Sequence, residues 1–360
     1  MRIAVLGGGH GAHAAAADLS EQGHEVRFWR RDAAALQGLM AKGALRLTDA
    51  AGSRDVPIHA VTPDIGDAVQ GAELILMPGP AMAQVDIARA MAPYLSDGQG
   101  ILMPPGSFGT WVVMDTLRAE GCSADLLLGE SGTLPWLARM QGPEEVAIVT
   151  RATRLPTGVF PHARADEAFE LFSRAFPAVE RLTDGLDGAL MNAGPIIHPP
   201  LILMNAGPIE HFEHWDIHNE GTQPAIRRVT DALDAERVAV REALGYGPPH
   251  FPLADHYDDS RPEWMYGQAA HDRLVVSSRW RERLDLTSHR YMREDVAIGL
   301  AFLVSVARWV GVPAPVASGL LALAGAINGE DFSVTGRTLE RLGLADLAPA
   351  ALQTRLREGF

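Results

Sequence analysis

Short apolar runs alternate with segments of helical period through the first half of the chain. An apolar run without polar interruption is the pattern of a strand buried on both faces of a parallel sheet. Strands that alternate with helices predict a doubly wound α/β domain with a parallel sheet. The predicted strands cover residues 3–6, 25–29, 44–48, 56–61, 73–77, 100–103, 126–128 and 146–150. Helices are expected over residues 14–19, 33–42 and 82–91.

The pattern changes after about residue 185, where the alternation of strands ends. Residues 226–244 repeat apolar positions near the 3.6-residue period of a helix, and Gly245 follows them as a stop signal. Further helices are predicted over residues 294–310, 316–327 and 335–342. The first of these would have Glu294 and Asp295 at its N-terminus, where the helix dipole favours negative charge. We therefore predict an α/β domain over residues 1–185 and an all-helical domain over residues 186–360.

The first predicted strand ends in a glycine-rich turn. Gly7, Gly9 and Ala12 have the G-x-G-x-x-A spacing between a strand and a helix of small residues. Gly7 permits the tight turn, Gly9 leaves the backbone open to a pyrophosphate, and Ala12 lets the helix approach the strand. This context predicts a Rossmann-type dinucleotide site, and the alternative is a turn that binds no ligand. The expected cofactor-binding residues are Gly7, Gly9, His10, Gly11, Ala12, Arg30, Arg31 and Pro78.

The end of the second predicted strand indicates which cofactor binds. NAD-binding domains usually have an acidic residue there, which accepts a hydrogen bond from the ribose 2′-hydroxyl. Here the position is occupied by Arg30, followed by Arg31. A guanidinium cannot accept that hydrogen bond and suits a 2′-phosphate. We predict NADP as the cofactor, with NAD as an alternative. The remaining alternative is that Arg30 and Arg31 are solvated and do not contact the cofactor.

Three predicted strands of the first domain end in loops rich in proline and glycine. Ligands of a doubly wound sheet bind at the carboxyl ends of its strands. The loops at Pro78, Pro104 and Glu130 are therefore candidate walls of the dinucleotide site. Ordinary turn chemistry explains the same residues.

Composition narrows the classes of partner. The formal net charge of −14 leaves no broad basic face for phosphates, so no nucleic-acid partner is expected. The single cysteine, Cys122, cannot form an intrachain disulfide, which favours a reducing compartment. The most apolar long run, residues 296–310, is too short to cross a membrane. The chain enters a strand at residue 3, so we expect no signal peptide and a cytoplasmic protein.

Two segments of the helical domain carry candidate chemistry. His198 is the titratable group in an apolar segment, and an imidazole can transfer protons near neutral pH. Asp295, at a predicted helix N-terminus, would stay ionised and could fix the tautomer of a histidine. Taken alone, such a histidine is more often a core residue, and spacing does not pair His198 with Asp295.

Several motifs in a consistent order resemble those of the opine dehydrogenases, the octopine/nopaline dehydrogenase family. The chain is most similar to the bacterial members that make N-(1-carboxyethyl) amino acids. The resemblance covers nearly the whole length. Besides the glycine-rich turn, its motifs are Thr133-Leu134-Pro135-Trp136, Asn192 with His198-Pro199 and Asn205-Ala206, Glu220-Gly221, Arg290-Tyr291 with Glu294-Asp295 and Gly299-Leu300, and residues 336–344.

The resemblance implies an oxidoreductase that condenses a 2-oxo acid with the amine of an amino acid and reduces the imine. It implies His198 as the catalytic acid and base, with Asp295 as its partner. Arg290 would hold the carboxylate of the 2-oxo acid, and Thr133 would lie near the bound substrates. Where octopine-type enzymes carry an acid that meets arginine, this chain has Gly132, which argues against arginine as the amine donor. Glu130 could still contact the amine, or be a solvated loop acid.

Other interpretations remain at this point. A reductase of a free 2-oxo or hydroxy acid, without an amine partner, often uses a lysine, and the single Lys42 lies in the first domain. A non-catalytic NADP-binding module would not need His198 or Asp295. His211, His214 and His218 could share a helix face, but hydride transfer needs no metal, and we expect none. Apolar helices of the second domain would serve a homodimer, and burial within one chain explains them equally well.

Overall fold

The computed structural model describes residues 1–258, 260–267 and 283–360. It divides into a first unit, Met1–Ala189 with Arg355–Phe360, and a second unit, Leu190–Thr354. The division lies close to the boundary predicted after residue 185. The C-terminal residues 355–360, expected in the helical domain, belong to the first unit. In the described part of the chain, no helix is long and apolar enough to span a membrane.

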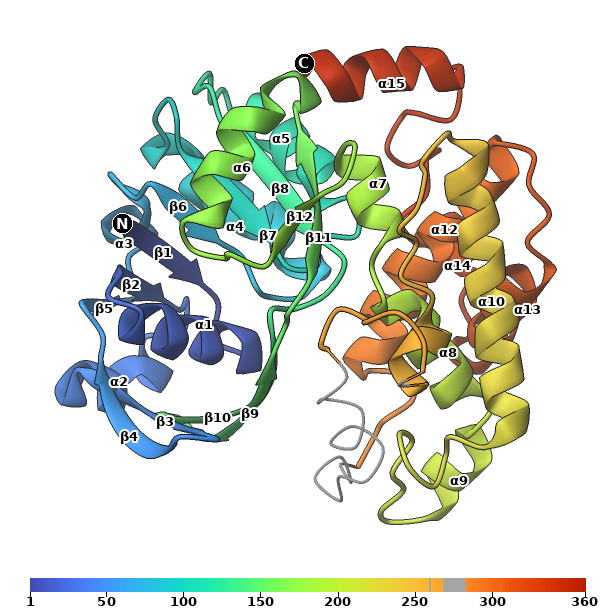
Figure 1. The fold of residues 1–360 in the computed structure, drawn as a ribbon, viewed down its shortest axis with the longest axis horizontal. Coiled ribbons are helices and arrows are strands. Elements are labelled where there is room, and N and C mark those ends of the chain that lie inside the picture. The colour runs from blue at the N-terminus through green and yellow to red at the C-terminus, as the bar shows by residue number, and fades with distance from the viewer. Residues whose placement is uncertain (259, 268–282) are drawn as a thin grey trace. The chain divides into compact units, whose positions relative to one another are not determined.

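The first unit contains an eight-stranded sheet with the order β12-β11-β8-β7-β6-β1-β2-β5 (Figure 1). Every neighbouring pair is parallel except β8 and β11, which are antiparallel. The predicted doubly wound parallel sheet is confirmed, with this one departure. Its strands are β1 (Arg2–Leu6), β2 (Glu25–Trp29), β5 (Ala60–Thr62), β6 (Leu74–Leu76), β7 (Gly100–Met103), β8 (Leu127–Ser131), β11 (Leu155–Phe160) and β12 (Val179–Arg181). The helices of this unit include α1 (His10–Glu21), α2 (Gln37–Lys42), α3 (Ile65–Val69), α4 (Gln84–Met91), α5 (Gly109–Ala119), α6 (Ala165–Ser173) and α7 (Gly185–Leu190).

A second sheet in this unit was not distinguished by the sequence. Its order is β4-β3-β10-β9, so the predicted strand over residues 146–150 pairs here and not in the larger sheet. Its strands are β3 (Ala44–Asp49), β4 (Gly52–Pro57), β9 (Trp136–Gly142) and β10 (Glu145–Arg151). The predicted strand over residues 56–61 is divided between the end of β4 and the start of β5.

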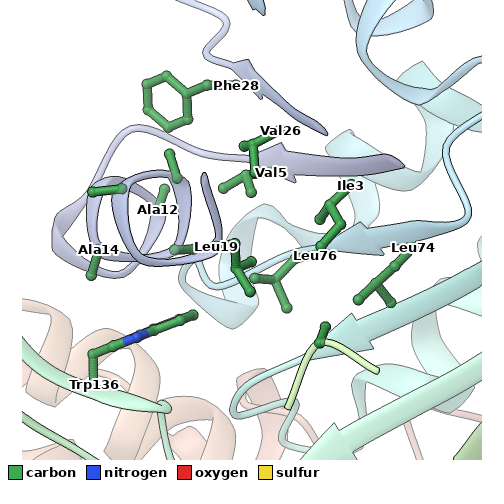
Figure 2. Close-up of a cluster of buried hydrophobic side chains, with 14 of the residues drawn as sticks. Ile3, Val5, Ala12, Ala14, Leu19, Val26, Phe28, Leu74, Leu76 and Trp136 are labelled. Atoms are coloured by element: carbon green, nitrogen blue, oxygen red, sulfur yellow. The ribbon is translucent and has the colours of Figure 1, made fainter. Parts of the chain in front are cut away.

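Helix α1 packs against strands of both sheets, which explains its small residues. Ala14 to Ala17 are all fully buried. Figure 2 shows Ala12 and Ala14 of α1 between Val5 and Val26 on one side and Trp136 on the other. Larger side chains would push the sheets away from the helix, so alanine sets the position of the helix that follows the glycine-rich turn.

Among the residues that the structure describes, the second unit contains helices joined by turns and loops, and no strand. Its helices are α8 (Gly194–Leu203), α9 (Ala206–His211), α10 (Pro224–Ala243), the 3₁₀ segment η5 (Leu253–Tyr257), the π-helix η8 (Tyr291–Leu300), α12 (Ala301–Trp309), α13 (Pro315–Asn328) and α14 (Phe332–Thr335). The C-terminal α15 covers Pro349–Glu358. Within this unit, α8 packs against η8 and α10.

The helix predicted over residues 335–342 is wrong. Helix α14 ends at Thr335, and turns follow. The backbone donors of these turns bond to neighbouring helices: Arg337 N donates to the Ala297 carbonyl, and Leu339 N donates to Ser305 Oγ. These tertiary hydrogen bonds replace the ones that a helix would make.

Candidate active site

His198 and Asp295 are in contact in the second unit. His198 lies in α8 and Asp295 lies in η8, and Nδ1 of the imidazole is 2.8 Å from Oδ2 of the carboxylate. The side chains are 14% and 9% exposed, so the contact is largely shielded from water. The resemblance implied that these two residues pair, although their spacing in the sequence did not. The structure brings them into contact.

Two glycines allow the close approach of α8 and η8. A Cβ at Gly194 would overlap Asp295 Oδ1, and a Cβ at Gly299 would overlap the Pro195 ring. A side chain at either position would force the neighbouring atoms to move. Glycine at these two positions therefore lets α8 and η8 pack closely enough to place Asp295 beside His198.

The helical segment that carries Asp295 is a π-helix and not the start of an α-helix. The Ala301 amide donates to the carbonyl of Val296, five residues earlier. Helical structure begins at Tyr291, so the prediction that Asp295 occupies the N-terminus is wrong. A π-helical turn is wider than an α-helical turn and is frequent at functional sites.

Burial controls the protonation of Asp295. Removal from water raises the pKa of the Asp295 carboxyl, while the positive fields of Arg290 and His289 lower it by less. The expectation that this carboxylate stays readily ionised at a helix N-terminus is therefore corrected. A buried carboxyl next to an imidazole competes with it for one proton.

Tyr291 is a residue of this site to which sequence reasoning gave no role. Its ring is stacked on the His198 imidazole, with centroids 3.8 Å apart and planes 15° apart. His218 approaches the same imidazole edge-on, with centroids 5.9 Å apart. The Arg290-Tyr291 motif was the available signal, but a stacking partner in another helix cannot be identified from one sequence.

Arg290 lies immediately before Tyr291 and close to the pair. Its side chain is 52% exposed and is 4.0 Å from Glu294 Oε2. The guanidinium carbon is 5.1 Å from the Tyr291 ring centroid. Half-exposed and next to the His198 stack, Arg290 has the charge and the access that a substrate carboxylate requires.

The glycine-rich loop of the first unit is shaped for a dinucleotide. Gly7 has φ = +140°, and Gly9 has open space where a Cβ would be. The Pro78 carbonyl lies 2.8 Å from the place of a Cβ at Gly11, so the loop after β6 adjoins the glycine-rich turn. His10 Nδ1 accepts a hydrogen bond from the Met140 amide. The residues present therefore fit the pyrophosphate of a nicotinamide dinucleotide.

The two arginines after β2 differ in their surroundings. The Arg30 side chain covers the loop, because a Cβ at Gly8 would lie 2.6 Å from Arg30 Cδ. Arg31 is 3.6 Å from Asp86 of α4 and is 70% exposed. Of the two, Arg30 is the one that lies over the dinucleotide loop.

Glu130 and Thr133 lie at and after the end of β8. Glu130 is fully buried and accepts hydrogen bonds from the backbone amides of Phe108, at 2.7 Å, and Thr110, at 3.1 Å. These bonds hold the loop after β7, so Glu130 supports that loop. Thr133 is 8% exposed, and its carbonyl accepts a hydrogen bond from Ser131 Oγ.

The histidines considered for a metal do not share a helix face, since α9 ends at His211. His218 instead contacts His198, as described above. Within residues 1–258, 260–267 and 283–360, no group of three or more His, Cys, Asp or Glu side chains is arranged to hold a metal ion.

Comparisons with known proteins agree with this geometry. The model of the NAD/NADP octopine/nopaline dehydrogenase alpha-helical domain matches residues 181–328. The chain is 29% identical over 357 residues to an opine dehydrogenase of Arthrobacter sp. (strain 1C), with 98% of this chain and 97% of that protein covered.

Solved structures share the fold. An octopine dehydrogenase with NADH and pyruvate has a TM-score of 0.71 at 21% identity, over 98% of both chains. A yersinopine dehydrogenase with NADP⁺ bound has a TM-score of 0.69 at 17% identity, over 99% of both chains. The matched helical domain and the full-length relative show similarity to the opine dehydrogenases and indicate an NAD(P)-dependent oxidoreductase, and the solved structures show the shared fold.

Proposed function

We propose that this protein catalyses the reversible reductive condensation of a 2-oxo acid with the amine of an amino acid. The product is an N-(1-carboxyalkyl) amino acid. Similarity to the opine dehydrogenases over the helical domain and over nearly the full length supports this reaction class. The observation that carries the assignment of residues is the 2.8 Å contact between His198 Nδ1 and Asp295 Oδ2.

His198 is the proposed general acid and base. The amine adds to the 2-oxo carbonyl, and the carbinolamine then loses water to give an imine. The departing hydroxyl needs a proton, which the His198 imidazolium supplies, and the neutral imidazole takes it back in the reverse reaction. A positioned group of this kind contributes about 10²–10⁴-fold to the rate.

Asp295 is the proposed partner that orients His198. Its contact with Nδ1 leaves Nε2 to exchange the proton with the substrate. The carboxylate also stabilises the imidazolium while the proton is held there. Tyr291 supports the same function, because its ring face is attractive to a cation and fixes the imidazole plane.

Two residues are proposed as substrate contacts, each argued from its own surroundings. Arg290 would bind the carboxylate of the 2-oxo acid through two parallel N–H···O bonds. Thr133 is kept as a substrate contact of the first unit. Glu130 would have to exchange its bonds to the Phe108 and Thr110 amides to meet an amine, so its position favours support of the loop.

NADP is the proposed preferred cofactor, and the glycine-rich loop is also compatible with NAD. When bound, the nicotinamide supplies the hydride that reduces the imine carbon. The Arg30 side chain over Gly8 supports binding of a 2′-phosphate, and Arg31 is a second, more exposed cation beside it.

Cellular location and assembly are also proposed. The single cysteine supports a reducing compartment, and we place the enzyme in the cytoplasm. Exposed apolar side chains of α13 and α14, Leu323 at 57% and Val334 at 64%, support a homodimer. Analytical ultracentrifugation of the full chain measures the latter directly.

The function is tested by following NADPH oxidation with pyruvate alone, with pyruvate plus a panel of amino acids, and with neither. Fast oxidation is expected in the second case, and mass spectrometry should detect the secondary amine. Oxidation that needs pyruvate but no amino acid would instead identify a reductase of free 2-oxo acids. Oxidation in none of the three mixtures would overturn the assignment.

A further inference from the structure

A cavity of about 200 Å³ lies inside the second unit, beside the segment that carries His198. Its apolar wall comes from Ile197 and Leu201 of α8, Ile226 of α10 and Leu253 of η5. Pockets for drug-sized ligands typically measure about 300–1,000 Å³, so an occupant of this cavity would be a smaller molecule.

Arg227 of α10 lines this cavity without a charged partner. Its guanidinium carbon is 4.5 Å from the Tyr257 ring centroid. Across the residues that the structure describes, the Arg227 side chain makes no hydrogen bond and no ion pair. Arg261, in the same lining, contrasts with it, because Arg261 contacts Asp255 at 3.4 Å and Asp258 at 3.3 Å. A half-buried guanidinium held by stacking alone retains all its donors for an anion.

Asp231, one helical turn after Arg227, supplies the opposite charge. It lines the exposed edge of the cavity and, within the described part of the chain, has no ion pair. Residues at i and i+4 of a helix commonly pair, but here Arg227 is turned onto Tyr257. Burial raises the pKa of the Tyr257 hydroxyl, while the positive charge of Arg227 lowers that pKa and the negative charge of Asp231 raises it.

One unpaired cation, one unpaired anion and an apolar wall are complementary to a zwitterion with an apolar side chain. We propose that this cavity binds a free α-amino acid, with its carboxylate on Arg227, its ammonium on Asp231 and its side chain against Ile197 and Leu201. The site is separate from the His198–Asp295 contact, and the proposal does not require that pair to be catalytic. Ile197 directly precedes His198 in α8, so an amino acid bound here would be next to the segment of the proposed proton donor.

Direct binding tests the site in the absence of NADPH and oxo acid. Isothermal titration calorimetry of the full chain would use L-leucine and two analogues, 4-methylpentanoate, which lacks the ammonium, and 3-methylbutylamine, which lacks the carboxylate. L-Leucine should bind most tightly. Arg227→Gln should weaken leucine and 4-methylpentanoate by about 10- to 100-fold, the range of a lost hydrogen-bonded charge. Asp231→Asn should weaken leucine by about 2- to 5-fold and leave 4-methylpentanoate unchanged.

Arg228→Gln is the matched control, since Arg228 is the next residue of α10 and is exposed. It should leave binding unchanged, and circular dichroism should show that every variant is folded. Equal binding by wild type and Arg227→Gln, equal weakening by Arg228→Gln, or no leucine binding up to about 10 mM would overturn the proposal.

Steady-state kinetics then show whether the cavity binds the amine donor or a second amino acid. If Arg227→Gln raises the KM of the amine donor by the same factor as it weakens leucine, the cavity holds the donor itself. If leucine binding is lost while kcat and KM are unchanged, the cavity is a second amino-acid site. Both results support the site, and neither depends on the assignment of His198.

Discussion

The imidazole of His198 and the ring of Tyr291 lie face to face, with centroids 3.8 Å apart and planes 15° apart. Asp295 Oδ2 lies 2.8 Å from Nδ1 at the edge of the same ring, so the imidazole is contacted on its face and at its edge. An aromatic pair contributes about 0.5–1.5 kcal/mol beyond its buried area, and a cation over the ring gains further attraction. Tyr291 therefore positions the proposed proton donor and favours its charged form.

Two replacements of Tyr291 distinguish the effect of its stacked ring from the effect of its hydroxyl group. Tyr291→Phe keeps the ring and should retain kcat within about threefold, whereas Tyr291→Leu should lower kcat about 3- to 10-fold, the equivalent of the stacking energy. In Tyr291→Leu the alkaline limb of the kcat/KM profile for the reductive direction should move to lower pH, because the imidazolium loses its contact with the ring. A purely structural role for Tyr291 would reduce the melting temperature and leave the limb in place.

Asp295→Asn should separate activity from stability. The amide cannot stabilise an imidazolium as a carboxylate does, and a drop of about 10²–10⁴-fold in kcat is expected. Burial raises the pKa of Asp295 in the folded state. Protonation of Asp295 therefore stabilises the folded wild-type protein, and this contribution to the free energy of unfolding is largest below the unfolded-state pKa, near 3.9. That stability is lost as the pH rises through the higher folded-state value.

The difference between the melting temperatures of Asp295→Asn and wild type should therefore shift in favour of Asp295→Asn as the pH rises from 4 to 8. A change of 1 kcal/mol corresponds to about 2–4 °C for a domain of about 150–250 residues, and the second unit, Leu190–Thr354, is of that size. Differential scanning calorimetry over that pH range measures the difference. A constant difference, or one that falls with pH, would contradict the effect of burial on this carboxyl.

The first unit could be predicted largely from sequence because its signals are local. A strand, a glycine turn and a helix of small residues follow one another within Arg2–Trp29, and each has a preferred conformation of its own. The second sheet was not distinguished, because the pairing of β3 with β10 joins segments about a hundred residues apart. Periodicity identifies a strand without identifying its partner.

The site of the second unit was predicted less well, for reasons visible in α8 and η8. Pro199 and Pro200 lie inside α8, and proline normally argues against a helix, so no helix was predicted around His198. A π-helix has no sequence period that differs clearly from that of an α-helix, and the helix start was therefore placed at Glu294 and not at Tyr291. The stacking of Tyr291 on His198 depends on both elements and could not be derived without them.

Gly194→Ala tests the steric basis of the His198–Asp295 contact. The new Cβ would overlap Asp295 Oδ1, and the carboxylate would have to move. A displacement of about 1 Å can cost about 10²-fold in rate, and overpacking typically costs about 1–3 kcal/mol of stability. Steady-state kinetics and thermal unfolding should both show the loss.

Gly319→Ala is the control for that substitution. Gly319 lies in α13, and a Cβ there would meet nothing within 4 Å. Alanine is the better helix former, so this variant should have wild-type activity and equal or higher stability. If both variants behaved alike, the close approach of α8 and η8 would not be what constrains Gly194.

Arg30→Ala should remove the preference for NADPH over NADH. The Arg30 side chain covers the glycine-rich loop at Gly8, whereas Arg31 is 70% exposed and faces Asp86. Loss of a guanidinium from a phosphate should raise the KM for NADPH about 10- to 100-fold and change the KM for NADH little. Arg31→Ala should give a smaller effect, because its charge is already balanced and solvated. Initial rates with both cofactors measure this difference, and a wild-type enzyme that prefers NADH would contradict the assignment of Arg30 to the 2′-phosphate.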